Sequence, residues 1–306
     1  MRAIAALGAL GALLPLAVAG AQQRSRFGGD YPSRIDTTVA FDAHGSVSLS
    51  APSGDIHVRG ATDGKLHVQA ESDDDNLRLD VTGSHATLDL AGGSRGSDAK
   101  FEVEVPVGVR VVARTQSGDI EIRGTRGEVE AHTQNGDITI DGVTTRLDVN
   151  TFSGDVTVGN VAGDVEIGTI NGDVHATDLR GDVDVTAVSG DIELRGVTAR
   201  IVRAKTTSGD VTFDGTIDPN GRYELTSHSG DVNLHVPRDA SAQLSISTWN
   251  GAVDSDFPIT LKPGEHGIGI ANAKNFTFQI GGGAARITAE TFSGDISISS
   301  NGRGAR

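Results

Sequence analysis

Five aspartates recur at intervals of 18 residues in the middle of the chain, each in a phrase that reads Ser or Asn, Gly, Asp, then Ile or Val. They are Asp119, Asp137, Asp155, Asp173 and Asp191. Carboxylates that repeat in register could supply oxygen ligands to Ca²⁺. Carboxylates in pairs could act as acid and base on a glycosidic bond. The spacing therefore raises two kinds of chemistry, a metal site and a polysaccharide-active enzyme.

The residues around these aspartates favour a structural role over Ca²⁺ binding. Calcium-binding rolls with a nine-residue repeat use a Gly-Gly-x-Gly-x-Asp turn, whose extra glycines aim several carbonyl groups at the ion. This chain has one glycine in each such turn. We therefore predict that the aspartates accept hydrogen bonds from turn amides. Ca²⁺ is kept as the lesser alternative, and no other cofactor is predicted.

The pattern also disfavours catalysis. A glycosidase needs two or three carboxylates in different environments at one place, whereas this chain repeats a single carboxylate in every coil. The nine histidines are scattered without His-x-His or His-Glu-x-x-His spacing, so a zinc site is not expected. We predict that the protein is not an enzyme, with a polysaccharide-active enzyme on a β-helix as the alternative.

The same phrase indicates the elements that position these side chains. Weaker echoes such as Arg126-Gly127-Glu128-Val129 fall midway between the copies, so the underlying step is nine residues and two steps make a coil. Such a period is typical of a β-solenoid, in which stacked coils bury a face that one coil cannot bury alone. Ile120 and Ile122 alternate with polar residues, so we expect them to point inward and stack on their copies. A Thr precedes most Ser or Asn residues by two positions, as Thr133 does, and we expect its hydroxyl to bond to its copy in the next coil.

The regular period covers only part of the chain. Its first 21 residues have one early cation, an apolar run and small-x-small cleavage sites, which predicts a secretory signal peptide. We predict an all-β, single-domain parallel β-solenoid with about 18 to 21 residues per coil. The predicted segments are a signal peptide (1–21), a flexible leader (22–33), irregular strands (34–113), regular coils (114–236), looser coils that close the solenoid (237–300) and a tail (301–306).

One position next to the turn is often apolar. Phe152, Ile170, Val188, Trp249 and Phe292 each directly precede the Ser or Asn of the phrase. If strand alternation continues to the turn, these side chains point outward as an apolar strip that could bind a partner. If the chain bends one residue earlier, they fill a corner of the core. We favour the corner, because polar residues such as Gln116 and Gln134 share the position.

Composition limits the partners. The net charge is −15, which disfavours nucleic acid, since phosphate binding needs clustered Lys and Arg. The chain has no cysteine, so disulfides and thiolate metal sites are excluded. After the signal peptide, no apolar stretch is long enough for a membrane span.

The chain resembles a known family in several places. The features are the phrase Thr-x-[Ser/Asn]-Gly-Asp-[Ile/Val], the opening at 41–59, the junction at 101–106 and the closing segment at 281–298. Together they are similar to the adhesin-like family of exported bacterial β-strand-repeat proteins that carries domain of unknown function 4097. The resemblance covers roughly residues 34 to 300. It implies a β-solenoid at the cell envelope and an adhesive role, and it implies no reaction and no catalytic residues.

These observations predict an exported, non-catalytic binding or scaffold protein in the periplasm or on the cell surface. Its expected partners are an envelope or extracellular protein or a polysaccharide. Besides the enzyme alternative, the acidic charge leaves a sensor of envelope stress or of cationic agents open. The oligomeric state and the handedness of the coil are left open.

Overall fold

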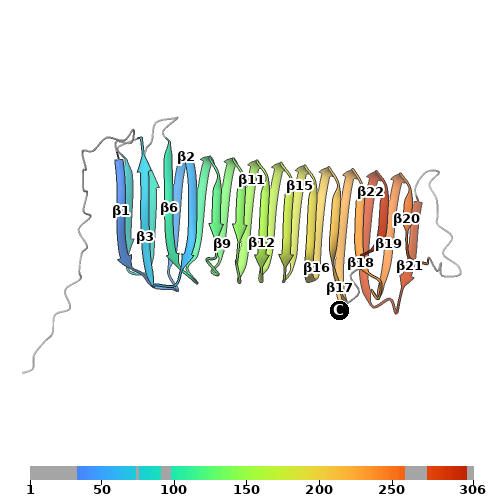
Figure 1. The fold of residues 1–306 in the computed structure, drawn as a ribbon. Coiled ribbons are helices and arrows are strands. Elements are labelled where there is room, and N and C mark those ends of the chain that lie inside the picture. The colour runs from blue at the N-terminus through green and yellow to red at the C-terminus, as the bar shows by residue number, and fades with distance from the viewer. Residues whose placement is uncertain (1–32, 74–75, 91–97, 259–273, 302–306) are drawn as a thin grey trace, which may run out of the picture.

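The computed structural model describes residues 33–73, 76–90, 98–258 and 274–301. Within these ranges the chain forms 23 β-strands, all connected by backbone pairing into one sheet that winds around a common axis. The strands stand side by side in a long row (Figure 1). The predicted all-β parallel solenoid is confirmed. The predicted signal peptide and nearly all of the leader and tail lie outside the described residues.

Each regular coil contributes one strand to each of two faces. In spatial order, the first face contains β1 (Ser33–Ala40), β3 (Lys65–Ser72), β6 (Ala99–Pro106), the second half of β2 (Ser46–Ala61), β8 (Ile120–Arg123), β10 (Ile138–Asp141), β12 (Val156–Val161), β14 (Val174–Leu179), the first parts of β16 (Ile192–Ser208) and β17 (Val211–Ser229), β18 (Val232–Pro237), β23 (Ile296–Asn301) and β20 (Val253–Ser255).

The second face is built in the same way. It contains β4 (Leu77–Thr82), β5 (His85–Leu90), the first half of β2, β7 (Arg110–Ser117), β9 (Val129–Asn135), β11 (Arg146–Ser153), β13 (Asp164–Asn171), β15 (Val183–Ser189), the second parts of β16 and β17, β22 (Ala285–Ser293), β19 (Ala242–Asn250) and β21 (Lys274–Ile280).

The core consists of ladders of equivalent side chains. On the first face Ile120, Ile138 and Val156 are directly opposite one another in adjacent parallel strands, and all three are buried. On the second face Val129 and Leu147 form the corresponding buried pair. Parallel strands lie about 4.8 Å apart, so each β-branched side chain packs on its neighbour above and below. The two predicted inward ladders are confirmed.

The Gly-Asp turn depends on its glycine for two reasons. Gly136 has a φ of 146°, a conformation that L residues rarely adopt. A Cβ at this position would also lie 2.1 Å from the carbonyl oxygen of Gly118 in the preceding coil. The chain is therefore sharply bent and closely stacked here, which leaves no room for a side chain.

The threonines bond differently from the prediction. The hydroxyl of Thr206 donates to the carbonyl oxygen of Gly190 at 3.1 Å, and that of Thr291 donates to Gly230 at 2.9 Å. The prediction of a bond between Thr copies is wrong, because the glycine carbonyl of the neighbouring coil lies within reach of the buried hydroxyl. The hydroxyls of Thr151 and Thr169 are buried without a hydrogen-bond partner.

At both ends, the spatial order of the coils differs from their order in the sequence. The coil formed by β2 lies between β5 and β6 on one side and β7 and β8 on the other. The coil formed by β22 and β23 lies between β17 and β18 on one side and β19 and β20 on the other. Figure 1 shows both insertions as breaks in the colour order, with blue β2 beside teal β6 and red β22 among orange strands. Each inserted coil is thus clamped on both sides.

Antiparallel strands complete the ends. β1 pairs antiparallel with β3, and β4 with β5, at the N-terminal end. β21 pairs antiparallel with β19 at the other end. Looser C-terminal strands do close the solenoid, but the final copy of the phrase lies one coil inside that end. No helix in the described part of the chain has the length and apolarity needed to cross a membrane.

Candidate functional site

The aspartates of the turns form a row along one edge of the solenoid. We call this the carboxylate row; in spatial order it contains Asp55, Asp119, Asp137, Asp155, Asp173, Asp191, Asp210, Asp231 and Asp295. The Oδ1 atom of each accepts the backbone N–H of the next aspartate, at 2.7 to 3.0 Å. The last one, Asp295, accepts the N–H of Ala252 at 2.7 Å. Each carboxylate therefore caps a turn amide of the adjacent coil.

This geometry accounts for the aspartates without a metal ion. The part of the chain that the structure describes contains no group of three or more His, Asp or Glu side chains that could hold one. The five aspartates considered for Ca²⁺ are brought into one line, as the period predicts, but one oxygen of each is committed to the backbone. Ca²⁺ binding is left without a set of ligands among the described residues.

The residues before the turn Ser or Asn point outward, so the corner interpretation is wrong. Phe152 is 54% exposed, and Ile170, Val188 and Phe292 are also exposed, while Trp249 is half-buried. The reason is that strand alternation continues to the end of β11. Thr151 points inward and is buried, Phe152 points outward, and the chain bends only at the glycine. The outward alternative that the sequence left open describes the geometry.

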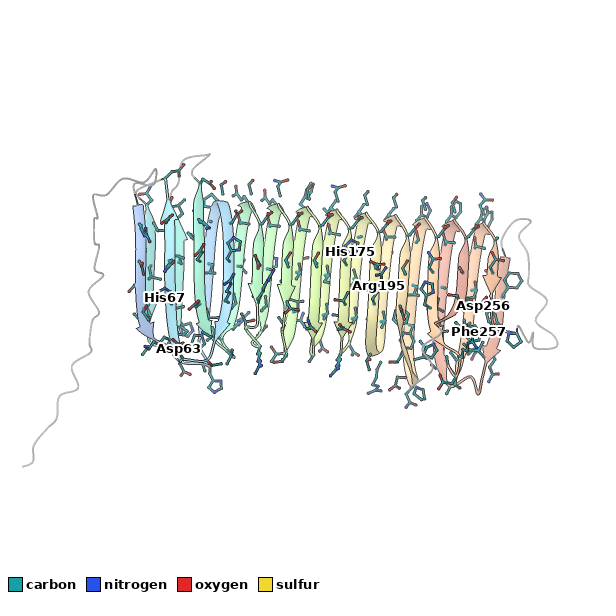
Figure 2. All side chains as sticks on the ribbon, viewed as in Figure 1. Asp63, His67, His175, Arg195, Asp256 and Phe257 are labelled. Carbon is teal, nitrogen blue, oxygen red and sulfur yellow. The ribbon has the colours of Figure 1, made fainter. Side chains whose placement is uncertain are left out.

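Stacking brings these residues into a line, which we call the strip. In spatial order its positions are Pro52, Gln116, Gln134, Phe152, Ile170, Val188, Thr207, His228, Phe292 and Trp249. In Figure 2, side chains project at regular intervals along the upper edge, where β11 ends. The strip has two apolar parts, an aliphatic and aromatic part from Phe152 to Val188 and an aromatic part from His228 to Trp249, with Thr207 between them.

The aromatic part is a product of the inserted coil. Phe292 lies between His228 and Trp249, with ring centroids 5.0 Å and 6.0 Å away and interplanar angles of 12° in both cases. Sequence order places Trp249 after His228 and gives no sign that Phe292 separates them. His228 was missed as a member of an aromatic group, because its partner is 64 residues away in the chain.

The charges beside the strip are unequal. Each strip residue is followed by Ser or Asn, then Gly, then Asp, with Ala252 in place of Asp after Trp249, and none of these positions or the strip positions holds Lys or Arg. Toward the second face, the position two residues before the strip is mixed, with Arg114, His132, Lys205 and Glu290 among polar residues. The strip therefore lies between an acidic row and a nearly neutral row.

The outer faces carry exposed ion pairs. On the first face, Glu193 contacts both His175, at 3.5 Å, and Arg195, and Figure 2 shows His175 and Arg195 near the middle of the solenoid. On the second face, the Glu130 carboxylate accepts a hydrogen bond from Arg110 and raises the pKa of that guanidinium. Exposed pairs of this kind add little stability, and each of these carboxylates has a basic partner.

A hollow of about 320 Å³ lies on the outer surface of β4 and β5. It is lined by Arg78, Asp80, Thr82, His85, Thr87 and Asp89. Both oxygens of Asp80 are engaged, one by the Thr82 hydroxyl at 3.1 Å and the other by Arg78 at 3.7 Å. The Oδ1 atom of Asp89, the second carboxylate of the hollow, is buried without a hydrogen-bond partner.

Comparison with known proteins places the chain by family. The family model described as Toastrack DUF4097 matches residues 47–299, which covers the inserted coils, the regular coils and the strip. No curated protein matches the chain.

Solved structures with a similar arrangement include two proteins described as proposed adhesion proteins. One, from Bacteroides fragilis, is 15% identical with a TM-score of 0.31, and the match covers 87% of this chain and 96% of that one. The other, from Clostridium sporogenes, is 10% identical with a TM-score of 0.23, and the match covers 88% and 100%. These values are too low to transfer a function.

Proposed function

The chain belongs to the Toastrack DUF4097 family, and from that premise we propose that it is an exported, non-catalytic protein of the cell envelope that holds a partner along the strip. The observation that carries the proposal is the exposure of Phe152, Ile170, Val188 and Phe292 in one line. A monomeric protein gains nothing in stability from apolar side chains in water, so exposed apolar side chains that line up on one edge support a contact surface.

The scaffold supports this use of the strip. Residues on one edge of stacked strands are fixed by backbone pairing on both sides, for example Ser153 between Asn135 and Asn171. The neighbouring strip side chains are therefore held at a constant spacing of about 4.8 Å. A preorganised surface loses little conformational entropy when a partner binds.

Export is proposed from the sequence. Its first 21 residues read as a signal peptide. A fusion of residues 1–33 to a reporter that is active only outside the cytoplasm would test this. Reporter activity is expected, and its absence would contradict export.

A pull-down from envelope extracts tests the binding role. The bait is the chain from residue 22 onward, compared with a triple variant that carries Phe152→Ser, Phe292→Ser and Trp249→Ser. The matched control is Arg195→Ser, which shortens a long exposed side chain on the first face. We expect a partner to be captured by the wild type and the control but lost by the triple variant. Capture that does not depend on the strip, or no capture at all, would contradict the proposal.

A further inference from the structure

The described part of the solenoid ends in an open core on its N-terminal side. Among the described residues, β1 pairs only with β3 and β4 only with β5, so both strands have a free edge at the end of the row (Figure 1). Their inward apolar side chains pack on the core but are only partly buried; they are Ile35, Val39, Leu79 and Val81. Ala70 lies opposite Ile35, and Leu88 lies opposite Leu79, and both are fully buried. A further layer on β1 and β4 would remove apolar surface from water.

The two edge strands at this end lack the usual protection. Proteins protect an edge with lysines, prolines, bulges or inward-pointing charges, or they keep the edge strand very short. β1 and β4 contain neither lysine nor proline, their registers with β3 and β5 are unbroken, and their inward positions hold no charge. At the other end, β20 has only three residues and β21 begins with Lys274. The N-terminal end is therefore the one suited to pairing with further strands.

The backbone of β1 has hydrogen-bonding groups that face away from the solenoid. The N–H of Phe41, which directly follows β1, donates to the carbonyl of Gly64 at 3.1 Å and continues the register with β3. Since N–H groups alternate in direction along a strand, those of Arg34, Asp36 and Thr38 point away from β3. An antiparallel strand can bond to these groups without disturbing the pairing with β3.

A second copy of the chain matches the edge of β1. A rotation of 180° about an axis normal to the two faces brings β1 antiparallel to the same strand of the partner. With the axis at Thr37, the inward Ile35 lies opposite the partner's Val39, and the outward Asp36 lies opposite the partner's Thr38. No two like charges are directly opposite in this register, and the apolar side chains continue the core.

The same axis serves β4 on the second face. Thr37 is level with Val58 across β3 and β6. Leu79 is level with Leu49 across β5. Val58 and Leu49 lie four and five residues from Gly54, which forms the turn of their coil. An axis through Thr37 that is normal to the faces therefore passes close to Leu79.

About this axis β4 is also complementary to itself. Leu79 lies opposite its own copy, and Leu77 lies opposite the partner's Val81, all on the inward side. On the outward side, Arg78 lies opposite the partner's Asp80, and the rotation forms this pair twice. Apolar pairs and opposite charges that face each other across antiparallel strands stabilise a sheet.

Other occupants match the open end less well. Residues 22–26 of the leader are five polar residues in succession, which cannot continue the inward apolar positions. A single strand from an unrelated protein would cover one face and leave the other open. A second copy covers both faces with one rotation.

We propose that two copies of the chain associate end to end through β1 and β4 as a two-fold symmetric dimer, in which both faces continue from one copy into the other. A contact of this kind closes on itself, so it forms a dimer and not a filament. Fewer residues take part than the roughly 20–30 a side of a standard interface, so we expect a dissociation constant in the micromolar range. The rotation places the strips of the two copies on opposite edges of the dimer. The inference is independent of the proposed function.

Sedimentation velocity over a range of concentrations tests the dimer, with the chain from residue 22 onward. We expect the wild type to change from monomer to dimer as the concentration rises. Asp36→Pro removes an N–H that only the partner would use, so the fold should be retained while the dimer weakens at least about tenfold. The matched control, Asp36→Ala, keeps this N–H and should dimerise as the wild type does. Circular dichroism melting checks that each variant is folded.

A charge exchange on β4 tests the register. Asp80→Arg brings two guanidinium groups opposite each other at both pairs and should weaken the dimer about tenfold. Adding Arg78→Asp restores opposite charges at both pairs and should recover the wild-type dimer.

Several results would overturn the inference. A wild type that stays monomeric up to millimolar concentration would do so, as would a dimer that Asp36→Pro leaves unchanged or a charge exchange that does not recover it. If the chain dimerises only after residues 22–32 are deleted, the leader covers the end in place of a second copy. Strip-dependent capture by a monomeric protein in the pull-down would leave the proposed function standing while this inference fails.

Discussion

The middle of the solenoid and its two ends are built from the same phrase but follow different rules of assembly. From β8 to β15, each coil stacks on the coil that precedes it in the sequence. At the ends, β2 and the β22–β23 coil are each inserted between two coils that follow one another in the chain. The repeated phrase therefore specifies the shape of each coil, whereas the order of the coils at the ends depends on contacts between segments that are distant in the chain.

The largest expected effect on stability comes from deleting a coil, and it should differ between an inserted coil and a regular coil. Deleting 285–306 removes the inserted coil and with it the buried Ile287, Ile296 and Ile298, each of which contributes about 2 kcal/mol or more. Because a domain is stable by only about 5–15 kcal/mol, we expect this chain to lose its folded C-terminal end. Deleting 136–153 removes one whole regular coil and joins Asn135 to Gly154, which keeps the register.

Urea unfolding followed by circular dichroism distinguishes the two deletions. The chain without 136–153 should unfold in one transition near the wild-type midpoint. The chain without 285–306 should show a much lower midpoint or aggregate. Similar midpoints for the two would contradict the distinction between middle and ends.

Glycine substitution gives the next largest effect. Gly154 has a φ of 144°, and a Cβ there would lie 2.0 Å from the carbonyl oxygen of Gly136, so Gly154→Ala should separate two coils and cost about 3 kcal/mol or more. Gly83, in the irregular N-terminal part, has a φ of 62° and open space around it. Gly83→Ala should cost only about 1 kcal/mol. Chemical denaturation of both variants measures the difference, and equal costs would contradict close stacking in the middle.

The carboxylate row predicts a smaller effect in the regular coils. Asp155→Ala leaves the N–H of Asp173 without its cap and should cost about 1–2 kcal/mol. Asp155→Asn keeps an oxygen at the same place and should cost less than half as much. Thermal unfolding measures the stability cost of each substitution. The same measurement with a Ca²⁺ chelator shows whether a bound ion contributes to the melting temperature. A chelator-dependent melting temperature in the wild type would contradict the capping account.

The smallest effect concerns the transition from middle to end. Tyr223 lies in the lengthened coil of β17, where its hydroxyl donates to the Ala199 carbonyl at 2.8 Å and accepts the N–H of Asp218 at 2.8 Å. Burial raises the pKa of this hydroxyl above its usual value of about 10. The unfolded chain therefore releases this proton first, so the stability linked to Tyr223 is present below about pH 10 and is lost as the pH rises through the folded-state pKa.

Melting temperatures between pH 8 and pH 11 measure this loss. Tyr223→Phe should be less stable than the wild type at pH 8 because it lacks two hydrogen bonds. Its melting temperature should then fall less steeply above pH 10. A wild type and a variant with parallel pH profiles would contradict the burial of the hydroxyl.

The sequence predicts the stacking of the coils in the middle of the molecule but not the order of the coils at its ends. The 18-residue period predicts the inward ladders from Ile120 and Val129, because a stacked repeat has only one register that buries them. It does not predict where Phe292 lies, because the order of coils depends on contacts between distant segments. The prediction that Phe152 fills a corner of the core is wrong. A position that holds both polar and apolar residues is as compatible with an exposed row as with a corner.

Engineered cysteines in pairs test the spatial order of the coils most directly, since the chain has no cysteine of its own. A disulfide requires Cα atoms within about 7 Å, a condition that adjacent coils meet and coils two steps apart do not. We predict that His228→Cys with Phe292→Cys will crosslink under mild oxidation and that His228→Cys with Trp249→Cys will not. The reverse result would show that the coils stack in sequence order, and the aromatic part of the strip would not exist.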